Sequence, residues 1–175
     1  MTHLPADDPT VPPRRIGVLL LNLGTPDATD YWSVRRYLGE FLWDPRVIET
    51  PRPIWWFILN GIILSTRPQK SGANYARIWD KDLDESPLRI ISRAQAEKLQ
   101  AAFADRDDIV VDYAMRYGNP STESRIRALQ AQGCERILLF PLYPQYSAPT
   151  TATANDKAFD ALKALRWQPA VRTVP

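Results

Sequence analysis

Side chains able to bind a ligand gather in three segments that each follow an aliphatic run, at 23–26, 116–120 and 143–151. The second segment opens with Arg116 and Tyr117. An arginine beside a tyrosine can hold a carboxylate while the tyrosine ring stacks on an aromatic face. The first segment has a single glycine, so the glycine-rich fingerprint of a nucleotide site is missing. The three segments therefore suit a flat, largely apolar ligand with a polar edge.

The elements that position these segments alternate between strand and helix patterns. Residues 16–22 form a nearly unbroken aliphatic run, which is typical of a central parallel strand covered on both faces. Further strands are expected at 109–115, 135–142 and 170–174, and helices at about 86–103, 121–131 and 150–165. This alternation predicts an α/β fold with a doubly wound, Rossmann-like parallel sheet of four strands. Ligands of such sheets bind beyond the carboxyl ends of the strands, where the three segments are expected.

Capping residues predict where the helices begin. Thr25 suits an N-cap and Pro26 a first helical position, so a helix is expected to start directly after the first strand. Ser86 and Pro87 repeat this pair, and Gly133 suits a left-handed helix end. The expected apolar face of the first helix consists of Val34, Tyr37, Leu38, Phe41 and Leu42.

Residues 44–85 differ in composition from the rest of the chain. They are rich in proline, arginine and tryptophan and show no clear strand pattern. Their most apolar stretch, 54–64, includes Trp55, Trp56 and Phe57. At about 11 residues it is far shorter than the roughly 20 that cross a bilayer. A helix this apolar has to be buried or to meet lipid. We expect a short helical excursion over the rim of the domain and no membrane-spanning segment.

Composition limits the classes of function. The 175 residues suffice for one domain, and the formal net charge of +2 with scattered basic residues leaves no footprint for nucleic-acid binding. A lone cysteine, Cys134, excludes an internal disulfide framework and a multi-cysteine metal site. We expect residues 1–15 to form a disordered tail without a targeting signal and 16–175 to form the domain. The composition suits the reducing cytoplasm.

Five strings occur in the order and spacing of the ferrochelatases: LLLNLGTP (19–26), YARIW (75–79), SPL (86–88), MRYGNP (115–120) and PLYPQYS (141–147). The sequence therefore resembles the bacterial members of this family. The resemblance implies a chelatase that inserts ferrous iron into protoporphyrin IX to form protohaem, in haem biosynthesis. It also implies that the porphyrin lies between two similar α/β domains, of which this chain is the first. Iron and porphyrin are then substrates, and no tightly bound cofactor is expected.

By this resemblance seven residues match porphyrin-binding positions: Leu23, Arg67, Tyr75, Ser86, Arg116, Tyr117 and Tyr143. Leu23 would stand over one porphyrin face near the metal, and a leucine there favours protoporphyrin over coproporphyrin. Arg116 and Tyr117 would line the side where metal enters, with Tyr143 as a nearby wall residue. Each match has a structural alternative, such as core packing for Leu23 or helix capping for Ser86.

The resemblance also implies that the stretch at 54–64 is an apolar lip around the mouth of the site. In this family the lip is thought to rest on the membrane, on the cytoplasmic face in a bacterium. Trp55, Trp56 and Phe57 would form that peripheral membrane contact. The alternative is that these three side chains simply pack in the core.

Residues needed for metal insertion are missing from the sequence. Two pyrrole protons must leave, and the family supplies a histidine, with a glutamate nearby, from its second half. The only histidine here is His3, in the expected tail. We therefore expect no catalytic residue and no metal ligand in this chain, and we interpret it as an inactive half that ends between domains at Pro175. Ala148 stands where some members carry a cysteine ligand, so no iron–sulfur cluster is expected.

Two other functions compete with the half-enzyme. A stand-alone tetrapyrrole-binding or carrier module would need no base, which agrees with the lack of a histidine near the three segments. A short chelatase that works as a homodimer would still need histidines at its cleft and ranks last. The acidic stretch 80–85 before Ser86 is a further departure from the family pattern.

Overall fold

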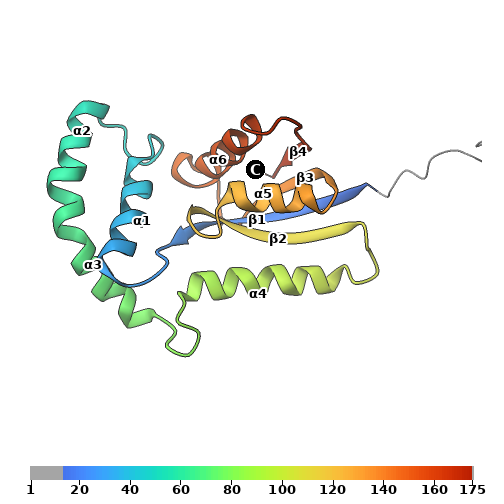
Figure 1. Cartoon of the computed structure of the whole chain (residues 1–175), viewed down its shortest axis with the longest axis horizontal. Coiled ribbons are helices and arrows are strands. Elements are labelled where there is room, and N and C mark those ends of the chain that lie inside the picture. Colours follow the sequence, from blue (N-terminus) through green and yellow to red (C-terminus); the bar gives the residue numbers. More distant parts are fainter. Residues whose placement is uncertain (1–13, 175) are drawn as a thin grey trace, which may run out of the picture.

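A four-stranded sheet organises the computed structural model, which describes residues 14–174 (Figure 1). All neighbouring strands run parallel in the order β2-β1-β3-β4. Their bounds are Arg15–Thr25 for β1, Ile109–Gly118 for β2, Cys134–Pro141 for β3 and Ala170–Thr173 for β4. The predicted fold class and strand order along the chain are confirmed. The expected tail lies almost entirely outside the described residues, and His3 with it.

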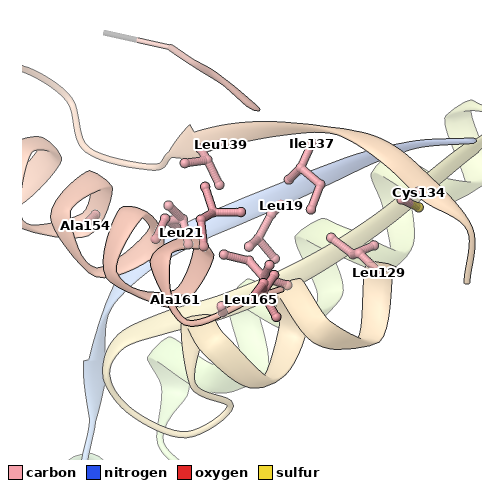
Figure 2. Packing of buried hydrophobic residues seen from close by; sticks show 13 residues of the cluster. Leu19, Leu21, Leu129, Cys134, Ile137, Leu139, Ala154, Ala161 and Leu165 are labelled. Carbon is pink, nitrogen blue, oxygen red and sulfur yellow. The ribbon is translucent and has the colours of Figure 1, made fainter. Parts of the chain in front are cut away.

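Strand β1 lies inside the sheet, and its side chains alternate between two hydrophobic layers. Leu19 and Leu21 are fully buried on the face covered by α5 (Thr122–Ala131) and α6 (Thr153–Lys163), where Figure 2 shows them beside Leu139 of β3. Val18 and Leu20 point to the opposite face, where they pack with α4 (Pro87–Ala102). Burial on both faces explains why this strand has an unbroken aliphatic sequence.

The predicted N-cap is confirmed at α4 but not at the first helix, and Gly133 has the left-handed backbone predicted after α5, with φ of +83°. Ser86 accepts a hydrogen bond from the amide of Arg89, and a serine likewise caps α5. The first helix, α1 (Tyr31–Trp43), begins later than predicted, because Asp30 accepts from two amides of its first turn. Thr25 instead closes β1, where it pairs with Gly118 of β2. A carboxylate that satisfies two amides is a stronger cap than a threonine hydroxyl committed to a strand end.

Beyond α1 the chain forms a long helix that is interrupted once. It comprises α2 (Arg52–Ile58), a single π-helical turn η1 (Leu59–Ile63) and α3 (Leu64–Ile78), called the rim helix below. In Figure 1, α1, α2 and α3 stand together beyond the carboxyl end of β1. The predicted excursion is helical, but it is long rather than short, because the helix continues beyond the apolar stretch through the more polar residues of α3.

Two features dock the rim helix on the rest of the molecule. Pro68 inside α3 has no amide hydrogen for the carbonyl of Leu64, and the Tyr31 hydroxyl donates to that carbonyl instead, at 3.0 Å. At Gly72 a Cβ atom would lie 2.4 Å from the carbonyl oxygen of Thr29, so only glycine permits this approach. A second π-helical turn, η2 (Ala148–Ala152), precedes α6. None of the helices in 14–174 has the length and apolar character needed to cross a bilayer.

Candidate functional site

Asp44 is the centre of a buried polar cluster at the carboxyl edge of the sheet. It follows the last residue of α1 and is only 6% exposed. Its Oδ2 atom accepts hydrogen bonds from the Tyr117 hydroxyl at 2.8 Å, from Arg116 Nη2 at 2.5 Å and from the hydroxyl of Thr153. Asp44 therefore joins the end of α1 to the end of β2 and to the start of α6.

Arg116 is committed to this cluster through most of its guanidinium group. Besides Asp44, its Nε atom donates to the Thr153 hydroxyl at 2.7 Å, and its guanidinium carbon lies 4.2 Å from the centre of the Tyr117 ring. A Glu40 carboxylate oxygen lies 4.0 Å from Nη1. Burial acts to raise the pKa of Asp44, but the hydrogen bonds from Thr153 and Tyr117 and the charge of Arg116 hold it below its ordinary value.

Aromatic rings link this cluster to the rim helix. Phe41 lies edge-on to Tyr117 at 5.1 Å and stacks on Tyr37, and Tyr75 of α3 contacts Tyr37 edge-on at 6.2 Å between ring centres. The Tyr37 hydroxyl donates to the carbonyl of Gly24 at 3.2 Å. Burial, and then the neighbouring phenols, raise the pKa of Tyr37 above its ordinary value. The predicted residues Tyr75 and Tyr117 are thus brought together through two residues of α1.

Tyr143 follows β3 at the same edge and differs from the other tyrosines. Its hydroxyl is buried and has no hydrogen-bond partner among residues 14–174. Burial raises its pKa to about 12, against the opposing influence of the nearby Arg116 charge. A buried hydroxyl without a hydrogen bond lowers the free energy of unfolding. The Tyr143 hydroxyl can therefore bind a polar atom of a ligand or partner that is not among residues 14–174.

The other predicted contacts lie farther apart. Leu23 is half-buried near the end of β1, Ser86 is buried at the α4 cap, and Arg67 is exposed on α3. For these residues, as for Arg116, Tyr117 and Tyr143, porphyrin contact stays a prediction.

The three residues of the expected lip separate. Trp55 is buried, and its indole donates to the carbonyl of Leu42 at 2.7 Å, so it belongs to the core under the rim helix. Trp56 and Phe57 are 51% and 70% exposed. Trp55 thus packs in the core, the alternative left open for these residues, because helical spacing turns it toward α1 when its neighbours face out. Membrane contact of the other two stays a prediction.

A cavity of about 270 Å³ opens beside the cluster, lined by residues of β1, α1 and the segment after β2 that include Tyr37, Glu40 and Gly118. Its volume is near the lower limit for small-molecule pockets. Within 14–174, no three side chains of the metal-binding types His, Cys, Asp and Glu lie together.

Asp44 and Thr153 were missed by sequence reasoning. An aspartate before a proline reads as a local helix end, and a threonine inside a predicted helix carries no signal of its own. Their role depends on contacts across more than 70 residues of sequence. One signal was available in the sequence. Arg116 lies near the end of a strand that is expected to be buried, and a buried arginine needs a buried anion as its partner.

Comparison with known proteins agrees with the resemblance. The ferrochelatase family model matches residues 15–175. A ferrochelatase of Chelativorans sp. (strain BNC1) is 60% identical over 175 residues, which is all of this chain and 50% of that protein. Those of Agrobacterium fabrum and Mesorhizobium japonicum are 61% and 63% identical, over 100% and 92% of this chain and 51% and 46% of their own. The chain spans about half the length of the curated relatives it matches.

Proposed function

Because the chain belongs to the ferrochelatase family, we propose that it is the porphyrin-binding first half of an enzyme that inserts ferrous iron into protoporphyrin IX. One observation carries the proposal. Four residues that match porphyrin-binding positions by the resemblance come from three separate parts of the sequence and lie at or beside one edge of the sheet: Tyr75, Arg116, Tyr117 and Tyr143. Iron and porphyrin are the substrates in this proposal, and the chain contributes no tightly bound cofactor.

The residues of this half would bind and orient the macrocycle. Leu23 and the partly buried rings of Tyr75 and Tyr143 would offer an apolar surface, and the unpaired Tyr143 hydroxyl would offer a polar contact. Tyr117, by contrast, is fully buried. Asp44 holds Arg116 and Tyr117 in place, so that the edge is rigid before the porphyrin arrives. Exposed Arg67 is suited to a propionate. The base that removes the pyrrole protons would come from the second half.

An uncovered sheet face supports a second half as partner. On the side where α4 covers β1 and β2, the side chains of Leu138 and Leu142 are only partly buried, and Phe140 is 39% exposed. A sheet needs both faces covered, and an apolar patch of this kind marks a protein interface. The missing half is the partner we propose for it.

We also propose that the protein is cytoplasmic and touches the membrane surface peripherally. The exposed apolar side chains of the rim helix, Ile54, Trp56, Phe57 and Ile62, would make the contact. A porphyrin that partitions into lipid would then reach the site along this helix.

The test is to titrate the chain with protoporphyrin IX, alone and with Zn²⁺, and to follow the absorption spectrum. We expect a porphyrin shift without metalloporphyrin bands. Adding the second half of the Agrobacterium fabrum relative should restore metalation. Metalation by the chain alone would refute the half-enzyme, whereas binding without restored turnover would favour a tetrapyrrole carrier.

Two variants test the site itself. Tyr143→Phe and Arg116→Ala should each weaken porphyrin binding by about 1–3 kcal/mol, the usual range for a buried polar contact. Arg127→Ala is the matched control, since Arg127 pairs with Glu123 on the exposed side of α5. Unchanged affinity in both site variants would remove these residues from the proposed wall.

A further inference from the structure

The rim helix carries an unbalanced charge. Between Arg52 and Ile78 it has four basic residues, at positions 52, 67, 70 and 77, and no aspartate or glutamate. The whole chain has a formal net charge of only +2, so the remainder is slightly acidic. We infer that the rim helix binds an anionic phospholipid surface in preference to a neutral one. This inference rests on the membrane contact proposed above and adds the class of lipid.

The apolar part of the surface lies at one end of the rim helix. Ile54, Phe57 and Ile62 are each more than half exposed, and the Trp56 ring packs edge-on against Phe57 at 5.0 Å between ring centres. Exposed aromatic rings of this kind settle at the headgroup level of a bilayer, where their apolar bodies leave water. Arg52 lies beside this end, and its guanidinium lies 5.0 Å from the Trp43 ring centre.

The basic side chains of α3 are free to meet anionic headgroups. Arg67, Lys70 and Arg77 are exposed, and none forms an ion pair within the part of the chain that the structure describes. By contrast, Arg93 of α4 and Arg127 of α5 are paired with carboxylates. The rim helix therefore combines unpaired basic side chains, with no acidic residue beside them, and exposed aromatic rings on one element. Apolar insertion and electrostatic attraction would then act at the same membrane.

The test measures how the whole chain partitions onto vesicles of phosphatidylcholine, with and without phosphatidylglycerol. We expect stronger partitioning onto the anionic vesicles and loss of the difference at high salt. Replacing Lys70 and Arg77 by serine should lower anionic partitioning by about fivefold for each side chain near the surface. Arg67 is left unchanged because it is a proposed porphyrin contact. Lys98→Ser with Lys163→Ser is the matched control, because both are exposed cations outside the rim helix that form no ion pair among the described residues.

The outcomes distinguish the preference for anionic lipid from the proposed membrane contact itself. Equal partitioning onto both vesicles, or an equal effect of the control pair, would overturn the preference for anionic lipid. No partitioning onto either vesicle would overturn the membrane contact as well. The porphyrin spectral shift, measured on every variant, reports the proposed site and should stay unchanged in the Lys70 and Arg77 variant.

Discussion

Asp44→Asn removes one negative charge from a site on which three side chains depend. Arg116, only 11% exposed, would keep its charge without the carboxylate that compensates it. Removing one partner of a buried ion pair costs about 3–5 kcal/mol, because the remaining charge stays desolvated. Asparagine retains an oxygen that accepts from Tyr117 or Thr153, so we expect a loss near the lower end, about 3 kcal/mol.

Urea unfolding of the whole chain, followed by tryptophan fluorescence, measures this loss in free energy. Asp156→Asn is the matched control, because Asp156 also pairs with an arginine, Arg46, but at 46% and 39% exposure. Exposed pairs contribute less than about 1 kcal/mol. A loss for Asp44→Asn that is no larger than that of the control would refute the cluster as a source of stability.

The pH dependence of unfolding provides a second readout. The pKa of Asp44 is lower in the folded chain than its ordinary value, so the unfolded chain takes up the proton first. The stability from this group is therefore present above the unfolded pKa, near pH 4, and is lost as the pH falls through the folded pKa. Asp44→Asn should flatten that acid loss relative to the wild type, and an unchanged slope would contradict the assignment.

Three further changes test the docking of α1 and the rim helix, each by urea unfolding. Tyr31→Phe leaves the buried Leu64 carbonyl without a donor and should cost about 1 kcal/mol. Asp30→Ala removes the cap of α1 and should cost about 1 kcal/mol. Gly24→Ala should be more damaging than both, since φ is +110° and a Cβ atom would lie 1.9 Å from the Tyr117 carbonyl oxygen.

Controls for these changes lie on the same chain. Tyr146→Phe alters an exposed tyrosine, and Gly61→Ala adds a methyl group where nothing lies within 4 Å. Both should leave the unfolding midpoint almost unchanged. If Tyr31→Phe or Gly24→Ala matched its control, the corresponding contact would contribute nothing to stability.

Local patterns were sufficient to predict most of the sheet and two helix starts. The aliphatic run of β1 and the serine that caps α4 act over a few neighbouring residues, so the sequence displays them directly. The prediction of an N-cap at Thr25 was wrong because its outcome depends on a distant part of the chain. Its residue type is right, but pairing with Gly118, far along the chain, keeps it in the strand and leaves the cap to Asp30.

The candidate site was only partly visible in the sequence. Family strings pointed to Arg116, Tyr117 and Tyr143, and the structure adds that the first two are held by a buried carboxylate from the end of α1. The residues next to Asp44 in the sequence do not predict that contact, because it arises from packing between elements that are distant along the chain. Exposure is equally non-local: Trp55 and Trp56 are adjacent and identical in type, yet only the second faces water.

The π-helical turn lets the rim helix hold one residue more between two buried positions than a regular α-helix would. Leu59 and Leu64 are both buried although they are five residues apart, a spacing that a regular α-helix would place on different faces. Deleting Gly61 would bring the two leucines to a four-residue spacing, which a regular α-helix already places on one face, so α3 would keep its contact between Tyr75 and Tyr37. The alanine substitution at this position meets empty space. One residue more would instead rotate α3 by about 100° and change which of its faces meets the site, with no side chain altered.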